Sequence, residues 1–220
     1  TIQNIYAMKM DCAVLRHPSP GACLQLTQYV DSVVINAGDG THEHPSQALL
    51  DMMSIQEKFN KIKGLNIGIV GDILHSRVAL SNIFGLIKMG AKVTLCGPPH
   101  LIPKGIQELG VELSSNIDEV IEWADALNVL RIQNERMGKG IISSIREYRN
   151  FFGITKERLN THNKEIVILH PGPINRGVEI DSYVADGDQA IILDQVLNGV
   201  AVRMSILYLL LGPDREDENA

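Results

Sequence analysis

The 220-residue sequence predicts an α/β fold of two lobes, each a mostly parallel sheet flanked by helices. Short runs rich in Val, Ile and Leu alternate with segments of helical spacing, which is the pattern of parallel sheets. A composition of 45% hydrophobic and 21% charged residues is that of a globular chain with a sizeable core. The weakly apolar stretch EKFNKIKG, residues 57–64, divides these elements into an earlier and a later group.

Six short apolar runs are expected to form strands, because each stands between helical patterns. In chain order they are CAVLR (12–16), SVVINA (32–37), LNIGIV (65–70), KVTLC (92–96), ALNVLR (126–131) and EIVILH (165–170).

Five segments with helical spacing stand between or after these strands. They cover approximately residues 20–30, 44–60, 76–89, 116–124 and 194–211. The second has the clearest start, because Pro45 is pre-shaped for the first helical position and Ala48 and Met52 begin a core-facing stripe. Gly90 ends the third.

The lobe boundary is expected near residue 58. Residues 1–58 form the first domain, completed by the C-terminal helix 194–212, and residues 59–193 form the second. An acidic tail, 213–220, follows.

The opening residues, TIQNIYAMKMD, place Ile2, Ile5 and Met8 at helical spacing without an initiator methionine or a capping residue before them. We therefore expect the chain to be a fragment of a longer protein.

Charge and cysteine usage exclude several classes of function. The net charge of −6 and the absence of a basic block argue against nucleic acid or an anionic membrane as the main partner. Cys12, Cys23 and Cys96 have no metal-binding or redox spacing, so we expect reduced thiols in a cytoplasmic protein. No apolar run is expected to approach the roughly 20 residues that cross a bilayer, so we expect a soluble chain.

Three arginines stand at or after the carboxyl ends of expected strands, where ligands of α/β sheets collect. Arg16 ends AVLR, Arg77 follows the strand in GIVGDILHSR, and Arg131 ends NVLR. Each alone is more simply a surface or salt-bridged side chain. Together they predict a site for a small polyanion, because guanidinium groups bind carboxylates and phosphates through paired hydrogen bonds.

The start of the helix at 44–60 predicts a second part of this anion site. His44 falls at or next to the N-cap, and Gln47 lies three residues later on the same face. Free N–H groups at this helix end attract negative charge.

Other motifs carry weaker signals. GIVGD has Gly68 and Gly71 but lacks the third glycine of the dinucleotide fingerprint. His42 and His44 are two residues apart, which does not suit a metal site on a helix, so no metal is expected. The loop in LHPGPINRGVE is either a rigid turn or a set of exposed main-chain carbonyls that bind an amino group.

In combination these stretches resemble the catalytic chains of the aspartate carbamoyltransferase family. The matching motifs are RHP, NAGDGTHEHPSQALLD, GDILHSR, LRIQNER and HPGPINRGVEI, in that order along nearly the whole chain. The resemblance implies the carbamoyltransferase fold, with residues 1–58 in the carbamoyl phosphate-binding domain and residues 59–193 in the aspartate-binding domain. It implies transfer of the carbamoyl group from carbamoyl phosphate to the α-amine of L-aspartate in pyrimidine biosynthesis, without a cofactor.

The resemblance also assigns roles to individual residues. Arg16 and His44 would contact the carbamoyl oxygen, Arg16 also the phosphate, and Gln47 the carbamoyl nitrogen. Arg77 would bind the α-carboxylate of aspartate. Arg131 would bind the β-carboxylate, with Gln133 beside it. The carbonyls of Pro171 and Gly172 would bind the carbamoyl amino group.

The resemblance implies a homotrimer with shared active sites and allows a regulatory subunit as a further partner. The family's Ser-Thr-Arg-Thr phosphate motif and its lysine-bearing loop do not occur in the 220 residues. We therefore expect these residues alone to catalyse the reaction poorly.

Three other functions stay open at this stage. Ornithine carbamoyltransferase resembles the chain around HPSQ, but it has a cysteine in the loop where this chain has HPGP, and it lacks the arginine of LRIQ. A non-catalytic binding or regulatory chain of the same fold is a second alternative. A nucleotide-dependent oxidoreductase is a third.

Overall fold

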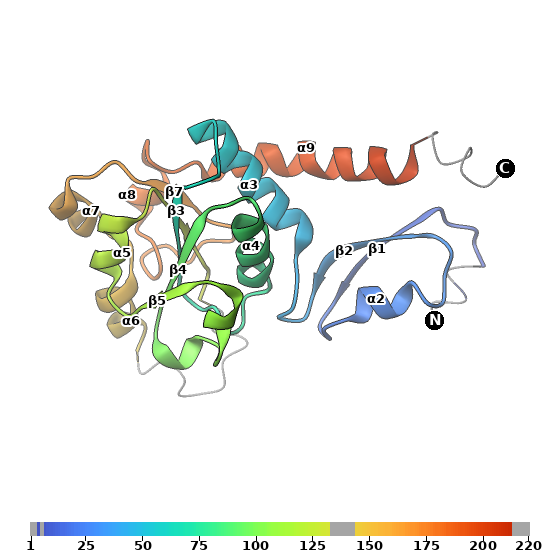
Figure 1. Ribbon diagram of the computed structural model, residues 1–220, viewed down its shortest axis with the longest axis horizontal. Coiled ribbons are helices and arrows are strands. Elements are labelled where there is room, and N and C mark those ends of the chain that lie inside the picture. The colour runs from blue at the N-terminus through green and yellow to red at the C-terminus, as the bar shows by residue number, and fades with distance from the viewer. Residues whose placement is uncertain (1–3, 5–6, 133–143, 213–220) are drawn as a thin grey trace.

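The computed structural model describes residue 4 and residues 7–132 and 144–212, and within them the strands form two parallel sheets (Figure 1). Helices flank both sheets, so the α/β class predicted from the alternating pattern is confirmed. The domain boundary near residue 58 stays a prediction.

The larger sheet has the strand order β5-β4-β3-β6-β7 among the described residues. Its strands are β3 (Asn66–Val70), β4 (Lys92–Cys96), β5 (Glu112–Ser114), β6 (Ala126–Val129) and β7 (Val167–Leu169). Side chains alternate between its faces: Ile67 and Ile69 belong to one buried cluster and Val70 to another. The sheet is therefore covered on both sides, as parallel sheets generally are.

Five helices of the described chain pack around this sheet: α4 (Arg77–Lys88), α5 (Ile117–Trp123), α6 (Ile145–Phe152), α7 (Lys156–His162) and α8 (Ser182–Ala185). The sequence analysis missed α6, α7, α8 and the short strand β5. Each of these helices has at most eight residues, too few for a clear helical period.

The smaller sheet pairs β1 (Cys12–His17) with β2 (Val33–Asp39), and α2 (Ala22–Leu26) connects them. Helix α2 is shorter than the predicted 20–30, because Gly21 in the left-handed region precedes it. Most residues of β1 and β2 are only partly buried.

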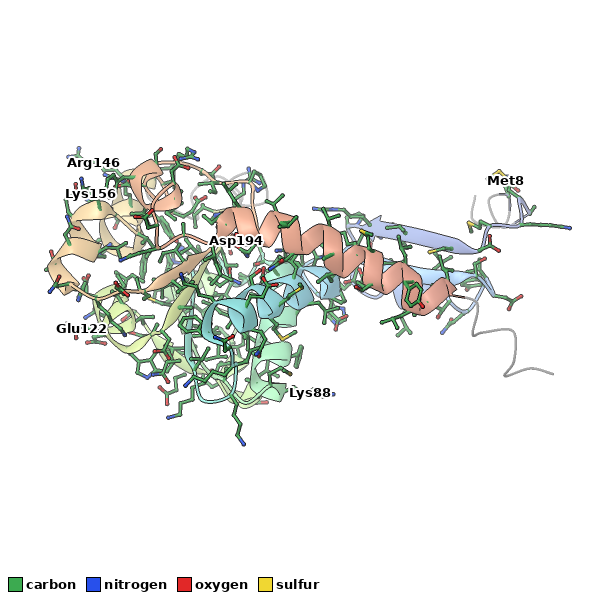
Figure 2. All side chains as sticks on the ribbon, turned by 90° about the horizontal axis from the view of Figure 1, so that it is seen from above. Met8, Lys88, Glu122, Arg146, Lys156 and Asp194 are labelled. Atoms are coloured by element: carbon green, nitrogen blue, oxygen red, sulfur yellow. The ribbon has the colours of Figure 1, made fainter. Side chains whose placement is uncertain are left out.

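Helices α3 (Pro45–Phe59) and α9 (Ile192–Leu211) pack against each other, and α3 also packs against α4. Figure 2 shows α9 extending from its first turn, marked by Asp194, beyond the larger sheet and along the β1–β2 ribbon. Its exposed apolar residues include Leu193, Leu197 and Tyr208.

The expectation that no segment is long and apolar enough to cross a membrane was wrong for α9. This helix has 20 residues with a mean hydropathy of 1.3, which passes that test by length and composition only. The sequence analysis underestimated it because Asp194 and Arg203 interrupt the apolar run. Its buried Gln195 and Asn198 donate hydrogen bonds to α3, so one face of α9 packs on protein.

The three cysteines are free, as expected. Cys23 and Cys96 are buried and Cys12 is partly buried. Burial raises the pKa of the Cys96 thiol to about 12, so this side chain stays protonated and unreactive at neutral pH.

Candidate active site

The first turn of α3 is built as the sequence predicts. His44 is the N-cap residue and Pro45 is the first helical residue. The backbone N–H of His44 donates to Ser81 Oγ of α4 at 2.9 Å. This bond holds the backbone of His44 at the junction between α3 and α4.

The imidazole of His44 lies in a strongly positive environment. Burial, and then the positive charges of Arg16, Arg203 and Arg77, lower its pKa to about 4. The ring is therefore neutral at pH 7, and one of its nitrogens carries a hydrogen that it can donate. Side chains from β1, α4 and α9 thus act on one imidazole at the start of α3.

Arg16 comes from an irregular part of β1. The register of the β1–β2 pair shifts between Leu15 and His17, and Arg16 occupies the shifted position. Bulges of this kind redirect a side chain near the end of a strand. The side chain is exposed and therefore accessible to a ligand.

The turn after β2 is held by Asp39, which is 2% exposed. Its carboxylate accepts hydrogen bonds from the N–H groups of Gly21 and Glu43 at 2.8 and 3.0 Å. Burial raises the pKa of Asp39, but these bonds and those from Asn36 and His42 outweigh it and the pKa is lowered. His42 is thus part of the turn that leads to α3.

Arg77 is the first residue of α4, after the N-cap Ser76, and is 7% exposed. Its guanidinium packs against the backbone of β2: a Cβ added to Gly38 would stand 2.7 Å from Arg77 Nη1. Gly38 has φ of +116°, where a side chain is strained. A glycine in the smaller sheet therefore makes room for an arginine of the larger unit.

The strand order creates a topological switch point next to Arg77. The chain moves outward from β3 to β4 and β5, and then crosses back to place β6 on the other side of β3. Ligands of open α/β sheets bind at such a switch point, beyond the carboxyl ends of the strands. Arg77 follows β3, and Arg131 stands two residues after the end of β6, partly exposed. Gln133 lies outside the described residues.

The loop after β7 lies at the same edge, because β7 pairs with β6. It is braced by His170, whose Nδ1 accepts from Gly172 N–H at 2.9 Å. The ring hydrogen is therefore on Nε2, which faces the fully buried Glu179 at 3.3 Å. Asn175 donates to the carbonyl of Ile132 at 3.1 Å and joins this loop to the segment after β6. The loop that contains Pro171 and Gly172 is thus held in one conformation.

Gln47 is 7% exposed and its amide donates to Asp51 at 2.9 Å, one turn further along α3. Because the amide nitrogen of Gln47 donates this bond, it faces Asp51 and the amide oxygen faces away.

The sequence analysis missed Arg203. Its side chain folds back over Gly199: a Cβ added there would stand 2.5 Å from Arg203 Nη1 and 3.3 Å from Leu50 of α3. A signal was present, because Arg203 is the one cation in the 20 residues of α9. Only the packing of α9 on α3 places it near His44.

A hollow of about 590 Å³ elsewhere on the molecule is a weaker candidate. It is lined by Asp118, Arg149, Arg158 and His162, among others. Its charges are already neutralised, because Arg149 pairs with Asp181 and Arg158 with Asp118. None of the arginines predicted for the anion site lines it.

Within the described part of the chain, no group of three or more His, Cys, Asp or Glu residues could hold a metal ion. The absence of a cofactor stays a prediction.

Two family models match the chain. The model described as the aspartate/ornithine carbamoyltransferase carbamoyl-P binding domain matches residues 1–57, and that of the Asp/Orn binding domain matches residues 63–210.

Individual proteins are similar over most of the chain. The aspartate carbamoyltransferase catalytic subunit of Christiangramia forsetii is 59% identical over 210 residues, which are 96% of this chain and 68% of that protein. The chain spans about two thirds of the length of the curated relatives it matches.

Two solved structures have the same fold. Trypanosoma cruzi aspartate transcarbamoylase in complex with carbamoyl phosphate has a TM-score of 0.83 at 27% identity, over 94% of this chain and 69% of that chain. The catalytic subunit of M. jannaschii aspartate transcarbamoylase has a TM-score of 0.82 at 33% identity, over 99% of this chain and 72% of that chain.

Proposed function

The chain belongs to the aspartate/ornithine carbamoyltransferase family, and from this premise we propose that it transfers the carbamoyl group of carbamoyl phosphate to the α-amine of L-aspartate. The products are N-carbamoyl-L-aspartate and phosphate, a step of pyrimidine biosynthesis. Support for aspartate as the acceptor comes from curated relatives at 52 to 59% identity, which are named aspartate carbamoyltransferase catalytic subunits.

The observation that carries this proposal is the neutral imidazole of His44 among three arginines. The neutral aspartate amine attacks the carbonyl carbon, the new C–N bond forms, and negative charge develops on the carbonyl oxygen. A hydrogen bond from His44 and the charge of Arg16 stabilise that oxygen more in the transition state than in the ground state. The bond from carbon to the phosphate oxygen then breaks, phosphate leaves with the electron pair, and the attacking nitrogen gives up one proton.

The remaining residues position the two substrates. Arg77, which follows β3, and Arg131, which follows β6, bind the α- and β-carboxylates of aspartate, with Gln133 beside Arg131. Gln47 and the carbonyls of Pro171 and Gly172 accept hydrogen bonds from the carbamoyl amino group. Holding both substrates in this geometry supplies much of the rate acceleration, because the bound substrates react as in a unimolecular step and are already oriented.

The acceptor specificity tests this function. Protein produced from its own gene is incubated with carbamoyl phosphate and either aspartate or ornithine, and the carbamoylated product is quantified. We expect turnover with aspartate and at most a trace with ornithine, because two arginines match two carboxylates. A preference for ornithine would identify the other branch of the family, and binding without turnover would identify a non-catalytic chain.

We also propose a homotrimeric assembly with shared active sites in the cytoplasm, with a regulatory subunit as a further partner. The free state of Cys12, Cys23 and Cys96 supports a reducing compartment. Light scattering of the purified protein measures the assembly directly.

A further inference from the structure

Asp51 is the centre of a buried polar network next to the site. It is fully buried, and four side-chain amides of the described residues donate to its carboxylate. Oδ1 accepts from Gln47 Nε2 at 2.9 Å and from Gln195 Nε2 at 2.7 Å. Oδ2 accepts from Asn82 Nδ2 at 2.7 Å and from Asn128 Nδ2 at 3.1 Å. One carboxylate thus joins α3, α9, α4 and β6.

The two carboxylate oxygens have different surroundings. The amides of Asn82 and Asn128 belong to the larger unit, on α4 and β6. The amides of Gln47 and Gln195 both meet Oδ1, so they lie within two hydrogen-bond lengths of each other. Gln47, the candidate site residue of this network, lies on the Oδ1 side.

A carboxylate determines which way an amide points. Burial raises the pKa of Asp51, and the four amide donors oppose that rise. Because Gln47 and Gln195 each donate from the amide nitrogen, they turn their nitrogens toward Asp51 and their oxygens away from it. The oxygen of Gln195 accepts the backbone N–H of His170 at 2.9 Å, at the start of the loop that contains Pro171 and Gly172. Asp51 thus controls both the amide of Gln47 and the position of that loop.

We propose that Asp51 is a positioning residue that makes the site select an amino group on the acyl phosphate. This inference rests on the proposed function. Asp51 orients the Gln47 amide so that its oxygen accepts from the carbamoyl nitrogen. Through Gln195 it also positions the carbonyls of Pro171 and Gly172 as acceptors for the same nitrogen. A rotated Gln47 amide would present N–H groups to the N–H groups of the substrate.

Acetyl phosphate is the probe for this selection. It has the same phosphate and carbonyl groups as carbamoyl phosphate, with a methyl group in place of the amino group. A methyl group cannot donate, so it leaves the acceptors of the site unpaired, which costs affinity. The ratio between the inhibition constant of acetyl phosphate and the KM of carbamoyl phosphate therefore measures how well the acceptors are placed.

The experiment compares this ratio in the wild-type protein and in Asp51→Ala. We expect the ratio to fall about tenfold or more in the variant, because two sets of hydrogen bonds lose their orientation. A folded Asp51→Ala with the wild-type ratio would overturn the proposal.

Gln195→Met keeps the experiment decisive if Asp51→Ala does not fold. It removes the two hydrogen bonds of the Gln195 amide, one to Asp51 and one to the backbone of His170, and leaves the bond between Asp51 and Gln47. We therefore expect the ratio to fall severalfold. An unchanged ratio in this variant would contradict the role of Asp51 in placing the loop.

Asn198→Ala is the matched control. Asn198 lies on the same α3–α9 interface and donates to Ser54 Oγ at 3.0 Å and to Glu57 at 2.7 Å, without contact to Asp51. We expect a lower Tm and an unchanged ratio. A ratio that falls equally in the control would mean that loosened helix packing, and not Asp51, is responsible. Wild-type protein that does not bind carbamoyl phosphate at all would instead refute the proposed function.

Discussion

At the scale of single residues, the site depends on a histidine kept neutral first by burial and then by nearby arginines. Arg16, Arg77 and Arg203 come from three separate elements, and their charges disfavour a further proton on His44. The same positive field that attracts an anionic substrate thereby keeps the imidazole in the form that donates a hydrogen bond without adding a charge.

His44→Ala should lower kcat more than it raises the KM of either substrate. The lost hydrogen bond strengthens as the oxyanion forms, and removal of one such donor typically costs about 2.7 to 4 kcal/mol, or a factor of about 100 to 1,000. Steady-state kinetics with both substrates varied measure this. An unchanged kcat would contradict the assigned role.

His44 should also make folding stability depend on pH. Its pKa is about 4 in the folded chain, below the ordinary 6.5, so between these values the unfolded chain binds a proton that the folded chain does not. Stability is therefore full above pH 6.5 and falls as the pH drops toward 4. Between pH 7 and 4.5, urea denaturation should show the wild type losing on the order of 2 kcal/mol more than His44→Gln. Equal losses in both proteins would refute the lowered pKa.

Arg131→Ala should raise the KM of aspartate by one or more orders of magnitude and leave that of carbamoyl phosphate nearly unchanged. The reason is that each charge-assisted hydrogen bond to a carboxylate is worth about 1.5 to 3 kcal/mol, and a guanidinium group can donate two of them to one carboxylate. An equal rise in both KM values would show that Arg131 affects the whole site and does not bind the β-carboxylate specifically.

At the scale of elements, the site depends on close contact between helix α4 and the smaller sheet. Gly38 in β2 lets the side chain of Arg77 from α4 lie against the backbone. The aliphatic part of the same arginine takes part in this contact, since its Cδ would stand 2.8 Å from a Cβ on Gly38. The position of Arg77, for which we propose binding to aspartate, is therefore set partly by the smaller sheet.

Gly38→Ala should displace the Arg77 guanidinium and raise the KM of aspartate at least severalfold. Gly64→Ala is the control, because Gly64 also has a positive φ, +81°, but has nothing within 4 Å of an added Cβ. Both substitutions should lower stability by about 1 kcal/mol or more through backbone strain. Kinetics and thermal melts of the two variants separate the displacement of Arg77 from the loss of stability. An equal KM of aspartate in both variants would argue that contact with Gly38 does not position Arg77.

At the scale of the whole molecule, the two sheets differ in how well they are buried. The five-stranded sheet lies between two apolar clusters, whereas the two-stranded sheet exposes part of most of its residues. Two-stranded sheets have little stability of their own. The part of the molecule that supplies Arg16 is thus the less stable part.

Hydrogen exchange should report this difference. Amides of β1 and β2 should exchange at least tenfold faster than those of β3 and β6 in the chain of 220 residues, because local opening of the smaller sheet exposes fewer apolar groups. Mass spectrometry of peptides from each sheet measures the rates. Equal protection of both sheets would mean that they open only together.

The sequence by itself determined the periodic and local features. Apolar runs located every described strand except β5 to within about two residues. In the larger sheet these runs are nearly continuous, because both of its faces are buried. Pro45 marked the start of α3, because a proline tolerates only the first helical turn. The placement of Arg77 and Arg131 after their strands followed from the same pattern.

Only the tertiary structure decided which distant residues meet. Asp51 and Gln195 are 144 residues apart, and their hydrogen bond exists because α9 packs on α3. The charge of Arg203 acts on His44 for the same reason, and Gly38 accommodates Arg77 only where α4 meets the smaller sheet. Contacts of this kind depend on how helices and sheets pack in three dimensions, whereas periodicity records only which side of each element is buried.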